Sequence, residues 1–172
     1  MARPAILFDR DGTLIEDPGY LSRPEQVTWM DGTFDALRQF AAAGYRLLII
    51  TNQSGIGRGL YSEDDMARVH ARLRDDLTKA GVTLDGIYHC PHTPEDGCAC
   101  RKPDIALIAQ AAAEHDLDLG RSWMIGDKCS DIAAGQAAGL RTVQVYGQAN
   151  CTPAPDLRSA SLTDAATLIL KA

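Results

Sequence analysis

Two acidic residues with the spacing of a catalytic pair stand near the start of the chain. Asp9 and Asp11 directly follow a short apolar run and precede Gly12 and Thr13. A first carboxylate can attack phosphorus and form an acyl phosphate, while a second donates a proton to the leaving group and later activates water. The spacing therefore favours phosphoryl transfer, with Asp9 as the nucleophile and Asp11 as the acid/base.

A second cluster has the composition of a metal site. Three sulfurs and one imidazole fall within about residues 90–100, and they are Cys90, His92, Cys98 and Cys100. This donor set suits tetrahedral zinc, and because all four ligands are protein groups, no position is left for an activated water. We therefore expect a structural Zn²⁺ in a zinc loop, with a loop of free cysteines as the alternative. Clustered cysteines favour metal over disulfides, and Cys129 and Cys151 stand apart from the cluster.

The elements that must position these residues alternate between strand and helix. Short apolar runs predict buried strands at 5–8, 45–50, 86–89, 123–125 and 142–146. Helical spacing predicts helices at 34–41, 62–77, 105–115, 130–138 and 162–170, with Ser62 and Ser130 as caps and a loop at 147–155. This alternation predicts an α/β fold with a parallel sheet covered by helices on both faces. Polar residues follow four of the strands, which would deliver them to one edge of the sheet.

Composition limits the class of protein. The chain has 172 residues, 45% of them hydrophobic, and a net charge of −6, so we expect one domain over 1–172. The basic residues are scattered, which argues against nucleic acid as a partner. There is no long apolar run and no signal peptide, which predicts a cytoplasmic protein without membrane contact. No exposed heptad pattern is evident, and we expect a monomer.

The chain resembles the haloacid dehalogenase (HAD) superfamily of phosphatases. The segment Asp9-x-Asp11-Gly12-Thr13 is similar to the opening signature of the superfamily. Three further matches follow in the superfamily's order, and they are Thr51-Asn52-Gln53-Ser54-Gly55, Arg101-Lys102-Pro103 and Gly126-Asp127-Lys128-x-x-Asp131. The resemblance covers nearly the whole chain and implies a Rossmann-like fold. Predicted helices and the zinc loop fill the stretches between Asp11, Thr51 and Lys102, so we expect no large cap domain.

The resemblance also implies roles for these residues. Mg²⁺ would be bound by the carboxylates of Asp9 and Asp127 and by the backbone carbonyl of Asp11. A hydroxyl and an ammonium group would stabilise the charge of the transferring phosphoryl group. The residues implied in phosphate or substrate binding are Thr51, Asn52, Arg101 and Lys102, with Lys128 and Asp131 in support. Because Arg101 and Lys102 directly follow Cys100, bound zinc would also position them.

The zinc loop before Arg-Lys-Pro narrows the resemblance to two groups, the D-glycero-D-manno-heptose 1,7-bisphosphate phosphatases and the histidinol-phosphate phosphatases. The segments 17–21, 51–59 and 123–128 look closer to the heptose enzymes, whereas the short loop between His92 and Cys98 is closer to the histidinol group. The expected reaction is removal of the C7 phosphate of the heptose bisphosphate, a small sugar phosphate. Alternatives are histidinol phosphate as substrate, a zinc-stabilised phosphate-binding module without turnover, and processing of DNA phosphate ends, which the acidic surface disfavours.

Overall fold

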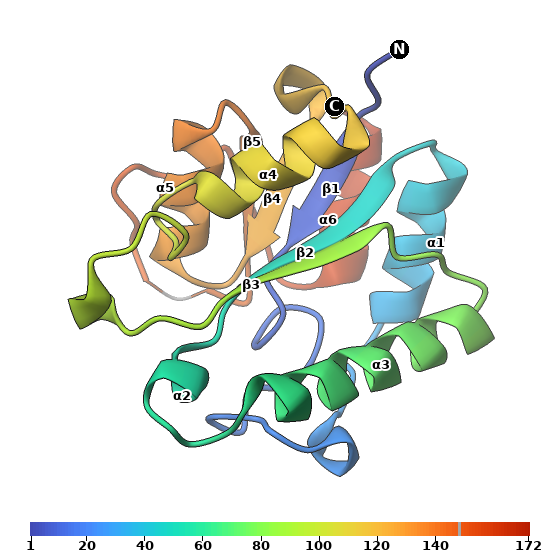
Figure 1. Cartoon of the computed structure of the whole chain (residues 1–172). Coiled ribbons are helices and arrows are strands. Elements are labelled where there is room, and N and C mark those ends of the chain that lie inside the picture. Colours follow the sequence, from blue (N-terminus) through green and yellow to red (C-terminus); the bar gives the residue numbers. More distant parts are fainter. Residues whose placement is uncertain (148) are drawn as a thin grey trace.

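The computed structural model describes residues 1–147 and 149–172, which form a parallel sheet flanked by helices (Figure 1). The strands are β1 (Ala5–Phe8), β2 (Arg46–Asn52), β3 (Gly86–Cys90), β4 (Trp123–Gly126), β5 (Arg141–Val145) and β6 (Leu157–Ser159). They lie in the order β3-β2-β1-β4-β5-β6, and every neighbouring pair is parallel. The predicted α/β class is confirmed. The strand β6 was not predicted, because it is short and only partly buried.

Helices cover both faces of the sheet. They are α1 (Thr33–Ala42), α2 (Ser54–Gly57), α3 (Glu63–Lys79), α4 (Ala106–His115), α5 (Cys129–Ala137) and α6 (Leu162–Leu170). Short 3₁₀ turns occupy Pro24–Gln26, Pro94–Asp96 and Leu119–Arg121. Ser62 caps α3 as predicted, since its hydroxyl accepts a hydrogen bond from the Asp65 amide. The predicted Ser130 cap is wrong, because α5 begins one residue earlier and Lys128 is its N-cap.

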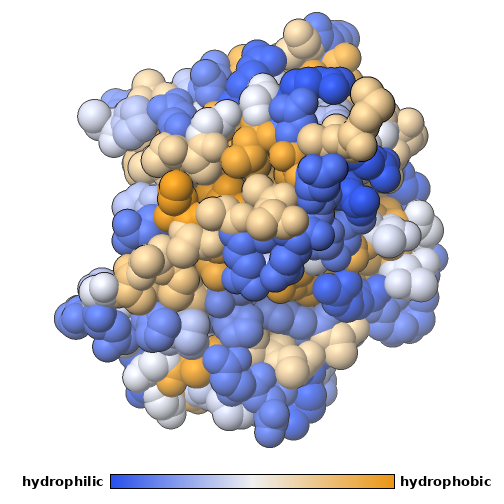
Figure 2. Space-filling model, turned by 45° about the horizontal axis from the view of Figure 1, so that its top comes forward, coloured by the Kyte–Doolittle hydropathy of each residue, from blue (hydrophilic) through white to orange (hydrophobic). Residues whose placement is uncertain are grey.

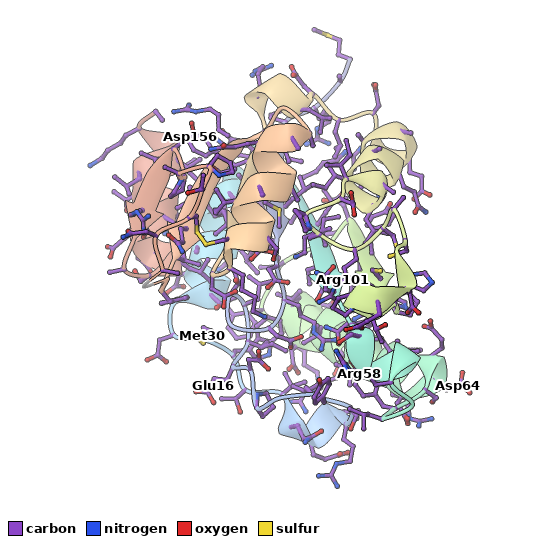
Figure 3. All side chains as sticks on the ribbon, turned by 90° about the vertical axis from the view of Figure 1, so that its left-hand side faces the viewer. Glu16, Met30, Arg58, Asp64, Arg101 and Asp156 are labelled. Carbon is purple, nitrogen blue, oxygen red and sulfur yellow. A yellow bond between two sulfur atoms is a disulfide. The ribbon has the colours of Figure 1, made fainter. Side chains whose placement is uncertain are left out.

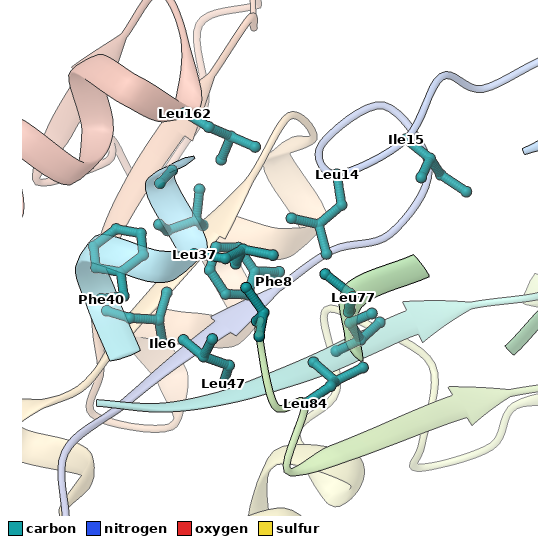
Figure 4. Packing of buried hydrophobic residues seen from close by; sticks show 14 of the residues in the cluster. Ile6, Phe8, Leu14, Ile15, Leu37, Phe40, Leu47, Leu77, Leu84 and Leu162 are labelled. Atoms are coloured by element: carbon teal, nitrogen blue, oxygen red, sulfur yellow. The ribbon is translucent and has the colours of Figure 1, made fainter. Parts of the chain in front are cut away.

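The side chains on the two faces of β1 pack into two separate hydrophobic cores. Ile6 and Phe8 join a cluster with apolar side chains of α1, α3 and α6 (Figure 4). Ala5 and Leu7 point the other way, into a cluster with α4 and α5. All four residues are fully buried, and each large apolar side chain buried in this way contributes about 1.5–3 kcal/mol. The central strand is therefore held from both sides, which fixes the point where Asp9 leaves the sheet.

Cys129 and Cys151 form a disulfide, drawn as a yellow bond in Figure 3. The preference for metal over disulfides concerned the clustered cysteines, which are free of disulfides; this disulfide between the two separate cysteines was not predicted. The cysteines are 22 residues apart, and they meet because the chain after β5 folds back over α5, where the Gln136 side chain donates to the carbonyl of Ala154. Spacing alone gave no sign of this return. Loop residues 147 and 149–155 lie outside any helix or strand, as predicted, and residue 148 lies outside the described residues.

The face of the molecule in Figure 2 carries both hydrophobic and hydrophilic residues, and the hydrophobic patches lie between hydrophilic residues. Large exposed apolar side chains include Tyr20 and Leu60, which are 51% and 56% exposed. None of the helices within residues 1–147 and 149–172 is long and apolar enough to cross a bilayer.

Candidate active site at the carboxyl edge of the sheet

Asp9 begins the site at the carboxyl end of β1. Its amide donates to the carbonyl of Ile125, so the pairing with β4 continues one residue beyond the strand. Its side chain is 6% exposed, and it opens onto a cleft of about 300 Å³ that Asp11, Asn52, Arg101 and Lys102 also line. The topology thus brings together residues that are up to 93 positions apart in the sequence.

Lys102 supplies positive charge beneath this cleft. Its Nζ donates to Asp9 Oδ1 at 3.0 Å, to Asp131 Oδ1 at 2.7 Å and to the carbonyl of Ile50 at 2.6 Å. Burial alone would lower the pKa of Lys102, but Asp131 and Asp9 outweigh it and raise this pKa, so the amine stays protonated. All three ammonium hydrogens have acceptors, which is how a buried lysine charge is tolerated.

Asn52 fixes the backbone from which Lys102 projects. Its Oδ1 accepts from the Lys102 amide at 2.9 Å, and its Nδ2 donates to the Lys102 carbonyl at 3.1 Å. The side chain of Asn52 therefore already has a positioning task, and its predicted contact with phosphate stays a prediction. Thr51 is buried, and its hydroxyl accepts from Gln53 Nε2 at 2.9 Å. Arg101 lines the cleft (Figure 3), whereas Arg58 lies on an exposed turn at the end of α2.

Three carboxylates have the arrangement of a cation site. Asp9, Asp127 and Asp131 each offer an oxygen, and these oxygens lie within 4.8 Å of one another. Burial, and then the charge of Asp9, raises the pKa of Asp127 to about 6. For Asp9 burial also opposes ionisation, but Lys102 and Lys128 outweigh it and hold its pKa below the usual value. The oxygen donors and the crowded negative charge fit Mg²⁺, which would relieve the repulsion.

The turn after Asp9 shapes the same site. Gly12 has φ of +81°, and a Cβ at this position would lie 2.5 Å from Asp127 Oδ2. The hydroxyl of Thr13 donates to Asp127 Oδ1 at 3.1 Å. The Asp-Gly-Thr sequence therefore serves to bring the β1 turn against the carboxylate that follows β4. Of the supporting residues, Asp131 contacts Lys102, and Lys128 Nζ lies 3.8 Å from Asp17 Oδ2 at the rim.

The cysteine and histidine cluster lies next to this cleft. Four of its donor pairs are 3.2–3.6 Å apart, and the pair Cys90 Sγ and Cys100 Sγ is 2.7 Å apart. Tetrahedral zinc with bonds of about 2.0–2.3 Å needs donor separations of roughly 3.4–3.8 Å, so the last pair must widen by about 1 Å. His92 presents Nδ1 to the sulfurs. The donor set and its closeness fit a closed zinc site.

A set of polar residues around Asp11 was not predicted to belong to the site. Arg10 forms an ion pair with Asp11, and Gln53 Nε2 donates to Asp11 Oδ2 at 2.7 Å. Tyr61 and His70 complete this set through contacts with Gln53 and Arg10. The only sequence signal was an arginine standing between two carboxylates, which a pattern-based prediction treats as a variable position.

Known proteins resemble this chain in both sequence and structure. The HAD-hydrolase-like family model matches residues 99–167. D-glycero-β-D-manno-heptose-1,7-bisphosphate 7-phosphatase of Helicobacter pylori strain J99 is 49% identical over 80% of this chain and 79% of its own length. D-glycero-α-D-manno-heptose-1,7-bisphosphate 7-phosphatase of Burkholderia mallei is 41% identical over 83% of this chain and 79% of its own length.

A solved structure shares the whole fold. D,D-heptose 1,7-bisphosphate phosphatase from B. bronchiseptica, complexed with magnesium and phosphate, superposes with a TM-score of 0.89 at 29% identity and covers 98% of both chains. The sequence identities show, and the parallel sheet with the acidic cluster at its carboxyl edge agrees, that the chain belongs to the heptose 1,7-bisphosphate phosphatase family of HAD-like hydrolases.

Proposed function

We propose that this protein is a Mg²⁺-dependent phosphatase that removes the C7 phosphate of D-glycero-β-D-manno-heptose 1,7-bisphosphate through an aspartyl phosphate on Asp9. The observation that carries the proposal is the buried Asp9 carboxylate, which faces Lys102 and lies within 4.8 Å of Asp127 and Asp131 at the floor of an open cleft. The choice of the β anomer rests on the relatives from Helicobacter pylori and Pasteurella multocida.

In the first half of the proposed reaction, Asp9 attacks phosphorus and the bond from phosphorus to the sugar oxygen breaks. Protonated Asp11, whose Oδ1 keeps a second lone pair beside the one that accepts from Arg10 Nε, gives its proton to the leaving oxygen, so the sugar departs as an alcohol. Lys102, held protonated by Asp131 and Asp9, stabilises the negative charge of the phosphoryl group. Bound Mg²⁺ would neutralise further charge on the phosphoryl oxygens.

In the second half, Asp11 takes a proton from water as the water attacks the phosphorus of the aspartyl phosphate. The bond from phosphorus to Asp9 breaks, phosphate leaves, and both aspartates return to their starting forms. Asp11 suits both tasks because its carboxylate, 14% exposed, lines the same cleft as Asp9.

We propose a structural role for zinc in the same site. The loop from Cys90 to Cys100 runs directly into Arg101 and Lys102, and the Arg101 guanidinium lies 3.4 Å from the carbonyl of His92. Zinc held by the four donors would therefore fix the segment that presents both basic side chains. A small sugar phosphate is the proposed partner, and we propose a cytoplasmic monomer that binds neither nucleic acid nor membrane.

The decisive experiment compares kcat/KM for the β and α anomers of heptose 1,7-bisphosphate and for histidinol phosphate, with Mg²⁺ and after chelation. We expect the β anomer to be preferred, activity to require Mg²⁺, and Asp9→Asn to release no phosphate. Preference for histidinol phosphate would refute the substrate. A wild type that binds Mg²⁺ and phosphate without turnover would instead identify a binding module.

A further inference from the structure

Arg10 is a fully buried charged residue between the two acidic residues. Its guanidinium forms a bidentate interaction with the Asp11 carboxylate: Nε donates to Oδ1 at 3.1 Å, and Nη2 donates to Oδ2 at 2.9 Å. Such a planar fork restricts both the position and the rotation of a carboxylate. Asp11 has a role in the proposed phosphatase reaction, whereas Arg10 has none.

Helix α3 holds the far side of this guanidinium. Arg10 Nη1 lies 2.9 Å from Met66 Sδ and 3.2 Å from His70 Nε2. Burial, and then the charge of Arg10, lowers the pKa of His70 to about 3. The imidazole is therefore neutral near pH 7, and it can accept a hydrogen bond from the arginine instead of repelling it.

Gln53 holds Asp11 from a second direction. Its Nε2 donates to Asp11 Oδ2 at 2.7 Å, and its Oε1 accepts from the Tyr61 hydroxyl at 2.6 Å. Tyr61 itself packs against Gly55, where an added Cβ would lie 2.1 Å from the ring. Asp11 thus has donors from two buried side chains, while part of its carboxylate remains open to the cleft.

We propose that Arg10 is a positioning residue that acts through Asp11: its fork, braced by Met66 and His70 of α3, keeps the Asp11 carboxylate aimed at the leaving oxygen. The inference rests on the proposed function, in which Asp11 transfers protons. In this proposal α3, which contributes no proposed metal or phosphate ligand, supports the proton transfer by holding Arg10 in place.

This role predicts a dependence on the leaving group. A sugar alkoxide is a poor leaving group and needs the proton from Asp11, whereas p-nitrophenolate leaves without one. Displacing Asp11 should therefore slow the first half of the reaction for the sugar phosphate and hardly affect it for p-nitrophenyl phosphate. Loss of metal or phosphate binding would slow both substrates.

The test is Arg10→Lys, which keeps the charge but cannot form the fork. The quantity measured is the first-turnover rate of leaving-group release from heptose bisphosphate and from p-nitrophenyl phosphate, at saturating substrate and Mg²⁺. We expect the sugar phosphate rate to fall at least about tenfold, with less than about threefold change for p-nitrophenyl phosphate and for both KM values. The matched control is Arg46→Lys, in a charge pair with Asp85 at the amino end of β2, which should leave both rates unchanged.

Equal slowing of both substrates, or no slowing of either, would overturn the proposal. Arg10→Gln, which removes the buried charge but keeps an amide donor, repeats the test if the lysine variant does not fold. If neither variant folds, Arg10 is needed for the structure and the positioning role is rejected. A wild type without turnover, or an Asp11→Asn variant with full activity, would instead show that the proposed function has failed.

Discussion

Replacing His70 with glutamine should change how stability depends on pH. His70 is largely buried against Arg10, and its pKa is lowered from 6.5 to about 3. Because the folded pKa is the lower one, the unfolded chain takes up a proton on this residue more readily than the folded protein does. The neutral histidine therefore costs nothing above pH 6.5, and its contribution to stability is lost progressively as the pH falls towards 3.

The size of the effect follows from the shift. At pH 5 the solution lies 1.5 units below the unfolded value of 6.5, so protonation of His70 in the unfolded chain costs about 2 kcal/mol of stability. Glutamine can still accept from Arg10 through its Oε1 but does not titrate. The stability of His70→Gln relative to the wild type should therefore rise by about 2 kcal/mol between pH 7.5 and pH 5.

The assay is denaturant unfolding of both proteins at pH 8.5, 7.5 and 5.0. The remaining titratable groups are the same in both proteins, so only the difference between the two free energies is interpreted. Between pH 8.5 and 7.5 this difference should stay constant, which serves as an internal control. A difference that is also unchanged at pH 5.0 would refute the reasoning, because His70 would then titrate as it does in the unfolded chain.

Three further predictions concern the charge, the zinc and the turn of the site. Lys102→Met leaves two buried carboxylates uncompensated and should lower the free energy of unfolding by about 3–5 kcal/mol; an unchanged denaturation midpoint would contradict this. Cys98→Ser removes one of the four proposed zinc donors. Elemental analysis should find zinc depleted, and denaturant unfolding should show a free energy lower by several kcal/mol; stoichiometric zinc in this variant would rule the proposed site out. Gly12→Ala should raise the Mg²⁺ concentration for half-maximal activity at least about tenfold, since its Cβ would collide with Asp127; Gly59→Ala, with φ of +71° and no atom within 4 Å, controls for strain alone.

Most of the fold could be predicted because buried strands and helices have recognisable patterns of apolar residues in the sequence. The runs Ala5–Phe8 and Trp123–Gly126 are continuous and apolar because both faces of a central parallel strand are covered. β6 escaped because Leu157–Ser159 is a three-residue edge strand that buries little. Ser130 misled because the Asp131 carboxylate, not a serine hydroxyl, accepts the hydrogen bond from the amide at the start of α5.

The candidate site was predictable as a set of residues but not as a network. A parallel sheet brings strand ends to one edge, so Asp9, Lys102 and Asp127 could be expected to meet. Nothing in the pattern indicated that Arg10 would turn back onto its neighbour Asp11 or that His70 would lie against it. Such contacts depend on side-chain directions and on the packing of α3, which spacing along the chain does not encode.

The place of β1 in the middle of the sheet constrains how a ribosome-bound chain can fold. One edge of this strand pairs with residues 46–49, but its other edge pairs with Trp123–Ile125, which are synthesised much later. Until that stretch has emerged, the nascent chain carries an unpaired apolar strand of the kind that associates with other chains. Fragments that stop short of β4 therefore have an open strand edge and also lack Asp127 and Asp131, two of the three clustered carboxylates.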